Sequence, residues 1–266
     1  MKLTVLVPAS LVAETDDARD ATAKVGQVAR AAAIFRCERV VVFDDTPDDG
    51  ELIAEVLRYA ATPPYLRKTV FDRRDELRYV GVLPPLGTPL HSVTTGSDSE
   101  GSEPEYREGV VTKVGTDGRV WVNCGTQHPV ALRVPDEGIR EGERVTLRVS
   151  SREPLRAEIA EDPPYGGYEV ERASLDGWLD SFDGVAVCTS RRGKEVELSD
   201  LRVDDDTDLA VVFGSPERGV QEILRERDAS VDFDYVLNTV PDQGVETVRT
   251  EEAVLATLTL ANIANR

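Results

Sequence analysis

Two consecutive strand–loop–helix patterns near the end of the chain constrain its fold most strongly. In the first, the apolar run 209–213 leads into a Gly/Pro loop at 214–219 and a short helical pattern at 220–227. In the second, the run 233–237 leads into another Pro/Gly loop and a helical pattern at 250–266. Apolar runs bounded by turn residues and followed by helices are typical of strands in a covered parallel sheet. The sequence therefore predicts an α/β fold.

The glycine-containing loops suit a nucleotide-like cofactor held by main-chain groups. Ordinary connections in an α/β sheet use the same residues, so that interpretation stays open. Loop 214–219 lacks a following Lys-Ser/Thr, so it is not a P-loop, and no G-x-G-x-x-G follows a predicted strand. In the last helix, Thr250 is expected to be the N-cap, with Glu251 and Glu252 in the first turn. The broad apolar side of this helix indicates that it packs inward.

The first part of the chain has the same character. Its predicted elements are strands at 3–7 and 40–43, a helix from Asp16 or Asp17 to Arg36, and a helix at 51–61. The continuous β-branched residues at 40–43 are typical of a parallel sheet covered on both faces. The many alanines of the first helix would permit close packing, either on the chain's own sheet or against a second subunit.

A change of composition divides the α/β pattern. Residues 94–104 are polar and of low complexity, which is typical of a linker. Short strands then follow at 109–114, 120–124, 130–134 and 145–150, with a hairpin signal at Asp117-Gly118. Short, regularly spaced strands predict a small β-barrel. We therefore expect an α/β domain formed by 1–93 and 160–266, with a linker and barrel inserted at 94–159.

The chain is strongly acidic, with 50 Asp and Glu residues against 31 Lys and Arg residues and a formal net charge of −19. Few lysines and abundant carboxylates are typical of a protein from a high-salt cytoplasm. There the Debye length is about 3 Å, so self-repulsion is screened. The acidity then reflects the habitat and not the binding partner. The other interpretation is an acidic protein that avoids nucleic acid, because nucleic-acid-binding proteins normally have a basic face.

Several classes of protein do not fit the sequence. No apolar run approaches the eighteen residues of a transmembrane helix. The first predicted strand runs directly into acidic residues, unlike a secretory signal, so we expect a cytoplasmic protein without a membrane partner. Cys37, Cys124 and Cys188 are far apart and form no C-x-x-C motif, so they are expected to be buried small residues and not metal ligands or disulfides.

One cationic segment has two interpretations. Its charged residues are Arg67, Lys68, Arg73, Arg74 and Arg78, and they are interleaved with Tyr65, Phe71 and Tyr79. Arginines and lysines could hold RNA phosphates while an aromatic ring stacks on a base. Because acidic residues stand among these cations, the segment could equally be a solvated face with internal ion pairs.

Seven strings in the chain, in this order and spacing, resemble a known family. The strings are LRYAATPPYLRKTVF (57–71), VGVLPPLGTPLH (80–91), YREGVV (106–111), GYEVERA (167–173), VAVCTSRRG (185–193), VVFGSPERG (211–219) and NTVPDQGVETVRTEEAVLATL (238–258). They resemble SPOUT-class RNA methyltransferases, and more narrowly the archaeal and eukaryotic branch with an inserted OB-like domain. The resemblance implies a SPOUT trefoil-knot fold with a parallel sheet, plus an inserted small all-β OB-like barrel.

The resemblance also implies a function. It implies an S-adenosyl-L-methionine-dependent RNA methyltransferase that acts on ribosomal or other structured RNA, forms a homodimer through the knot region, and uses no metal and no DNA. The residues implied to bind the cofactor are Gly214, Ser215, Pro216, Gly219, Asn238, Thr239, Val240, Pro241, Gln243, Gly244, Val248, Thr250 and Ala253. Glycine is expected at 214, 219 and 244 because close backbone approach leaves no space for a Cβ.

Methyl transfer from a sulfonium needs orientation and, for some acceptors, deprotonation, so no Ser-His-Asp or paired-carboxylate site is required. Candidate catalytic arginines are Arg67, Arg192 and Arg249, which could steer a phosphate or stabilise an oxyanion. All three could also be structural ion pairs. The alternatives to an enzyme are a non-catalytic RNA-binding or ribosome-assembly protein that retains the fold, and a cofactor-binding regulator without RNA.

Overall fold

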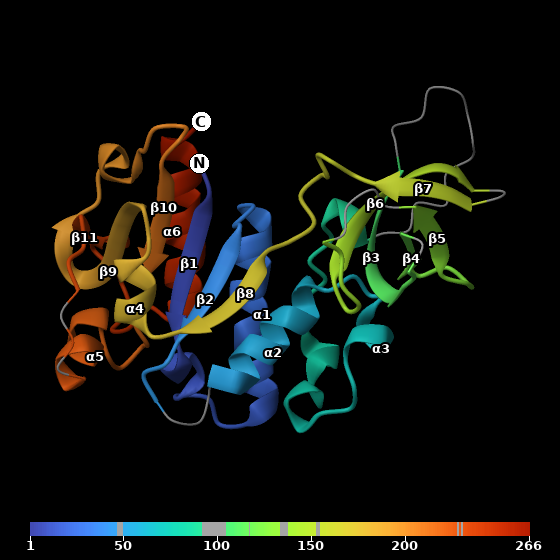
Figure 1. Ribbon diagram of the computed structural model, residues 1–266. Coiled ribbons are helices and arrows are strands. Elements are labelled where there is room, and N and C mark those ends of the chain that lie inside the picture. Colours follow the sequence, from blue (N-terminus) through green and yellow to red (C-terminus); the bar gives the residue numbers. More distant parts are fainter. Residues whose placement is uncertain are drawn as a thin grey trace. The chain divides into compact units, whose positions relative to one another are not determined.

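A six-stranded parallel sheet forms the centre of the first of two units of the chain (Figure 1). The strands lie in the order β11-β9-β10-β1-β2-β8. Their bounds are β1 Leu3–Pro8, β2 Arg39–Phe43, β8 Glu169–Ala173, β9 Gly184–Glu195, β10 Asp208–Val212 and β11 Tyr235–Asn238. The N-terminal strand β1 pairs with β10 on one side and β2 on the other, so segments distant in sequence close the sheet.

The computed structural model describes residues 1–46, 50–91, 105–116, 118–133, 138–152, 155–227, 229 and 231–266. Its first unit comprises Met1–Ala61, Arg74–Leu86 and Gly167–Arg266. The second comprises Thr62–Arg73 and Gly87–Gly166. The barrel segment therefore shares a unit with a short stretch that precedes it in the chain. The linker predicted at 94–104 lies outside the described residues.

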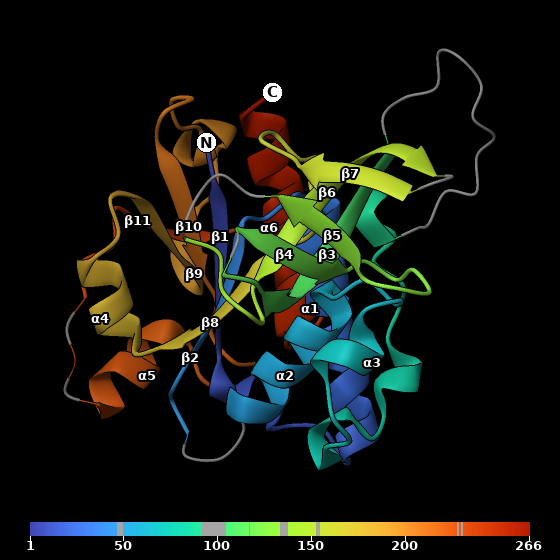
Figure 2. The same cartoon turned by 45° about the vertical axis from the view of Figure 1, so that its right-hand side comes forward.

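Helices cover both faces of the parallel sheet, as the continuous apolar strands predict. They are α1 Ala18–Ile34, α2 Gly50–Ala61, α4 Leu175–Asp180, α5 Val220–Glu226 and α6 Thr250–Ala264. Alternate residues of one strand enter opposite cores: Val5 packs with α1, α2 and α6, whereas Leu6 packs with α4 and α5. Two views of the same unit show α4 and α5 together on one side (Figures 1 and 2).

The two long helices begin in different ways. At α1 the prediction is confirmed: the Asp17 carboxylate accepts hydrogen bonds from the N–H groups of Arg19 (2.8 Å) and Asp20 (2.9 Å). At α6 the predicted cap is wrong, because Arg249 is the N-cap and its N–H donates to the Glu252 carboxylate (2.9 Å). The Thr250 hydroxyl points elsewhere and bonds a loop of the first unit.

The second unit contains a five-stranded antiparallel sheet in the order β5-β4-β3-β6-β7. Its strands are β3 Glu105–Val114, β4 Arg119–Asn123, β5 Val130–Arg133, β6 Arg144–Arg152 and β7 Leu155–Ile159. The edge strands β5 and β7 approach each other, so the sheet curls around a core of its own that includes Val122 and Leu147. This is the arrangement of a partly open, five-stranded OB-like barrel.

The three cysteines are buried free thiols. Burial raises the pKa of Cys37 and of Cys188 to about 12, so both stay protonated and unreactive near neutral pH. Within the ranges given above, no group of His, Cys, Asp and Glu has the makings of a metal site. In the same ranges no helix has the length and apolarity to cross a membrane.

Candidate active site

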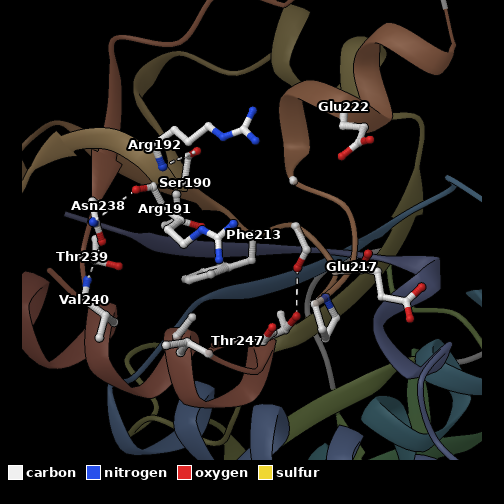
Figure 3. A pocket seen from close by; sticks show the side chains of 18 of the residues that line it. Ser190, Arg191, Arg192, Phe213, Glu217, Glu222, Asn238, Thr239, Val240 and Thr247 are labelled. Carbon is white, nitrogen blue, oxygen red and sulfur yellow. Dashed lines mark hydrogen bonds between the residues drawn. The ribbon is translucent and has the colours of Figure 1, made fainter. Parts of the chain in front are cut away.

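A cavity of about 630 Å³ lies where the carboxyl ends of β9, β10 and β11 give way to loops (Figure 3). Ligands of open α/β sheets bind at this end of the strands. The volume is within the usual range for small-molecule sites. The lining residues are Thr189–Arg192, Phe213–Glu217, Gly219, Gln221, Glu222, Arg225, Asn238–Val240, Gln243, Glu246–Val248, Thr250 and Ala253.

All the predicted cofactor residues line this cavity except Pro241 and Gly244. Tertiary folding thus brings together three loops that are separated in the sequence. The lining also contains residues that the sequence did not single out, among them Phe213, Glu217 and Glu222. Glu222 stands on the exposed side of a short helix, where a functional carboxylate cannot be distinguished from a solvated one by pattern.

The first loop turns tightly after β10, and its two glycines, Gly214 and Gly219, differ in whether a side chain would fit. A Cβ at Gly214 would lie 2.7 Å from the Arg218 carbonyl oxygen, so only glycine fits there. At Gly219, and at Gly244 in the next loop, a Cβ would meet no atom within 4 Å. At these two positions no described part of the chain requires glycine, so the predicted reason, close approach of the backbone to a cofactor, stays a prediction.

The second loop is tied to the end of β9 by the side chain of Asn238. Its Oδ1 accepts from the Val240 N–H (3.1 Å), and its Nδ2 donates to the Arg191 carbonyl (3.3 Å). Below it, the buried hydroxyls of Thr257 and Thr239 are 2.7 Å apart and join α6 to this loop. These bonds fix two walls of the cavity to each other before any ligand binds.

The third wall is the start of α6. The Thr250 hydroxyl donates to the Gly214 carbonyl (2.9 Å), so it connects α6 directly to the first loop. On the next residue, the Glu251 carboxylate lies 3.4 Å from the Lys24 ammonium of α1, and both residues are only 5% exposed. Burial lowers the pKa of Lys24, while the charge of Glu251 opposes that shift. Lys24 also pairs with Glu14.

A shift of register in β9 presents two arginines to the cavity. Val236 of β11 pairs with Cys188, but the next residue, Leu237, pairs with Lys194. The segment 189–193 therefore lies between successive ladder partners, as in an extended β-bulge, a feature common beside active sites. A Cβ at Gly193 would lie 2.7 Å from backbone atoms of β11, so glycine permits this close approach.

The candidate catalytic arginines are not brought together. Arg192 lines the cavity, and no described residue gives its guanidinium a hydrogen bond or ion pair. Arg249 is the N-cap of α6 and is not among the lining residues described. Arg67 belongs to the second unit, where its Nε donates to the Thr62 carbonyl (3.0 Å). Catalytic roles for all three remain predictions.

The cationic segment is divided between the units. Arg67, Lys68 and Arg73 belong to the second unit, whereas Arg74 and Arg78 belong to the first. Arg74 donates to the buried carboxylate of Glu55 at 2.9 Å, which supports the structural interpretation for this residue. The Arg78 guanidinium lies 5.6 Å from the centroid of the neighbouring Tyr79 ring. RNA binding by the five cations remains a prediction.

The parallel sheet, the loop-walled cavity at its carboxyl edge and the separate barrel define an α/β protein with a candidate small-molecule site. A family described as "Putative RNA methyltransferase" matches residues 2–261. An uncharacterised protein of Halobacterium salinarum is 52% identical over 97% of this chain and 98% of its own. The 28S rRNA (uridine-N(3))-methyltransferase of Homo sapiens is 31% identical over 96% of this chain and 76% of its own. The solved structure of the SpoU methyltransferase AviRb from Streptomyces viridochromogenes, at 11% identity, covers 98% of this chain and 59% of its own with a TM-score of 0.39.

The chain belongs to this family of RNA methyltransferases. The predicted RNA methyltransferase activity and the α/β fold with a barrel-like insert are thereby confirmed, while the SPOUT class stays a prediction. The enzyme moves a methyl group from a donor to RNA. The comparisons give no support to the alternative of a non-catalytic assembly protein.

Proposed function

We propose that the enzyme transfers a methyl group from S-adenosyl-L-methionine to N3 of a uridine in ribosomal RNA. The observation that carries the proposal is the cavity at the ends of β9, β10 and β11, walled by the three loops whose residues the family resemblance implied. The acceptor is proposed from the human relative, whose name states uridine N3 and whose similarity extends over 96% of this chain.

The residues present fit this donor. At Gly214 the main chain turns so tightly that a Cβ would lie against the Arg218 carbonyl oxygen. At Gly219 the position that a Cβ would take is open, which leaves room in the lining of the cavity. Glu217 adds a carboxylate, which suits a cationic ligand. Gly214, Gly219, Asn238 and Thr250 would hold the donor largely through main-chain groups. When bound, it supplies a methyl group on a positively charged sulfur that leaves readily.

A homodimer is the proposed assembly. Large apolar side chains are exposed on and beside α6: Val245 (59%), Leu255 (47%) and Ile263 (51%). Leu255 and Ile263 are eight residues apart and so lie on one face of the helix. Burying such a face against a second copy would remove apolar surface from water next to the cavity. The two copies would then meet beside their active sites.

The acidity of the chain and the location of the enzyme are part of the same proposal. A relative from Halobacterium salinarum is 52% identical, which supports the high-salt interpretation of the net charge of −19. In molar salt the charge does not prevent binding to RNA, because repulsion beyond a few ångströms is screened. We propose a cytoplasmic enzyme, since its proposed substrate is ribosomal RNA.

The proposal is tested with purified protein in molar potassium chloride. Ribosomal RNA from a strain lacking the gene is incubated with S-adenosylmethionine, digested, and examined for methylated nucleosides by mass spectrometry. We expect 3-methyluridine to appear at one position, and calorimetry to show binding of the donor. An enzyme that binds this RNA but neither binds the donor nor produces any methylated nucleoside would overturn the proposal.

A further inference from the structure

We propose that Arg192 and Glu222 together read the base-pairing edge of the acceptor uridine. Arg192 donates a hydrogen bond to a carbonyl oxygen beside N3, and Glu222 accepts the N3–H proton. This inference rests on the proposed function, and it assigns the recognition of the acceptor to two residues of the cavity. Neither side chain forms a hydrogen bond or ion pair with a described residue, so both are available to a ligand.

The side chain of Arg192 is exposed, but packing and hydrogen bonds fix the position of its backbone. It stands in the bulged segment 189–193 of β9, directly before Gly193, which packs against the backbone of β11. Its own N–H donates to the Ser190 hydroxyl at 3.2 Å. The bulge therefore directs the guanidinium into the cavity instead of along the sheet. Figure 3 shows it extending toward the α5 side.

Glu222 approaches the same space from the opposite wall. It lies on α5, whose residues Val220, Ile223 and Leu224 are buried against the sheet and fix the position of the helix. Glu222 is on the solvent side of this helix and lines the cavity. Figure 3 shows its carboxylate directed toward the cavity into which Arg192 extends.

Some of the other charged side chains around the cavity form hydrogen bonds or ion pairs within the chain. Arg191 donates to the Glu246 carbonyl at 3.1 Å. Arg218 pairs with Asp45 at 2.7 Å and with Glu226 at 2.9 Å. These bonds hold the loops together. Glu217 also lines the cavity and is proposed above to suit the cationic donor, and Arg225 lines it on the same helix as Glu222. Arg192 and Glu222 are the oppositely charged pair that faces the cavity from β9 and α5.

The chemistry of the pair selects a uracil edge. Uracil presents an N3–H donor between two carbonyl acceptors, and a guanidinium has only donors while a carboxylate has only acceptors. Cytosine has a lone pair at N3, which a carboxylate would repel. A base edge with the wrong pattern leaves buried polar groups unpaired, which is costly. The pair therefore favours uridine over cytidine.

The same contacts assist the reaction. The N3–H bond breaks and its proton passes to the Glu222 carboxylate, while the N3 electron pair forms the bond to the methyl carbon. As that bond forms, the electrons of the carbon–sulfur bond stay on sulfur, which loses its positive charge. Arg192 stabilises the negative charge that spreads onto the neighbouring carbonyl oxygen. Glu222 is thus the general base and Arg192 the electrophile.

The test uses full-length protein, S-adenosylmethionine and the ribosomal RNA described above. Glu222→Gln keeps the shape but cannot take the proton, and Arg192→Ala removes the donor. We expect each to lower the methylation rate about 100-fold, as general bases and oxyanion donors typically do. Calorimetry should show unchanged affinity for the donor. Glu195→Gln and Arg227→Ala change exposed residues outside the lining and should keep the wild-type rate.

A second RNA separates a chemical role from a structural one. Transcripts containing 5-fluorouridine have a more acidic N3–H, so they should restore part of the rate of Glu222→Gln but not exceed the wild-type rate. Three results would overturn the assignment while the proposed function stands. They are wild-type methylation rates in both variants, no rescue of Glu222→Gln by 5-fluorouridine, and a loss of donor affinity as large as the loss of rate. Methylation by the wild type at cytidine or guanosine would overturn it as well. If the wild type methylates nothing, the proposed function itself fails.

Discussion

Gly214 and Gly219 stand at the two ends of one loop, yet of these two only Gly214 is required by the packing of the protein itself. At Gly214 a Cβ would lie 2.7 Å from a backbone carbonyl oxygen, whereas at Gly219 it would meet no atom of a described residue within 4 Å. Gly219 has φ −69° and ψ 157°, a conformation open to any L-residue. A side chain at 219 is therefore compatible with the fold and conflicts only with a ligand in the cavity that this residue lines.

Gly219→Val should abolish binding of S-adenosylmethionine without changing stability, because the branched side chain would occupy space that the donor needs. Calorimetry measures the affinity, and thermal unfolding measures the stability. Gly81→Val is the control, since a Cβ there also meets no atom within 4 Å and the residue is not among those lining the cavity. Equal affinity in both variants would show that the donor lies elsewhere.

The buried pair of Lys24 and Glu251 connects α1 to the start of α6. Lys24→Met should lower the free energy of unfolding by about 3–5 kcal/mol, because it leaves the Glu251 carboxylate buried without its cation. Lys24→Met combined with Glu251→Leu should recover most of that loss. Urea unfolding of the three proteins measures the effect, and a double variant less stable than the single one would contradict it.

The same lysine predicts a pH dependence. Its pKa is lowered in the folded protein from 10.5, chiefly by burial, so above the lowered pKa the unfolded chain holds more protons. The Lys24 contribution to the free energy of unfolding should therefore rise with pH up to about 10.5. The difference between wild type and Lys24→Met, measured by urea unfolding at several pH values, should widen in that window. A constant difference would contradict the shift.

At the scale of elements, the junction between the first loop and α6 depends on one side chain. Thr250→Val removes the hydroxyl that donates to the Gly214 carbonyl and keeps the shape. We expect the free energy of unfolding to fall by about 1 kcal/mol, and donor binding to weaken about fivefold because the same energy is lost from the position of the loop. Thr259→Val is the matched control, because its hydroxyl bonds Leu255 within the same helix, away from the cavity. Equal donor affinity in the two variants would argue against the junction.

At the scale of the whole molecule, light scattering in high salt tests the proposed homodimer. The 29.1 kDa chain should scatter as a particle of twice that mass. Leu255→Glu together with Ile263→Glu should yield monomers, because charges would replace the exposed apolar face of α6. Val114→Glu, at an exposed apolar residue of the second unit, should remain dimeric. A wild-type monomer at micromolar concentration would exclude the dimer.

The division into units makes a further prediction about the barrel. Glu105 and Ala157 both pair with Val149, so they lie two strand spacings apart, about 10 Å. A short Gly/Ser linker can therefore replace residues 105–159. We expect donor affinity to stay nearly unchanged, since the lining residues all belong to the first unit, while RNA affinity falls. Calorimetry and fluorescence anisotropy measure the two, and full RNA binding by the deletion variant would show that the barrel does not read RNA.

The sequence by itself determined the elements of this protein and the order of its loops. Continuous apolar strands, glycine-containing loops and helix starts such as Asp17 are local signals, because their physical causes lie within a few residues. They predicted the parallel sheet, the barrel strands β3 to β6 and, with the family resemblance, nearly all the loop residues around the cavity.

Only the tertiary structure decided which of those residues face the cavity and why. Thr250 reads as a helix cap, yet its hydroxyl bonds a carbonyl 36 residues earlier. Pro241 and Gly244 fall outside the lining, whereas Glu222 enters it and Gly193 proves to be needed for close packing on β11. Hydrogen-bond partners and steric space at these positions come from segments far apart in the chain, and no local pattern contains them.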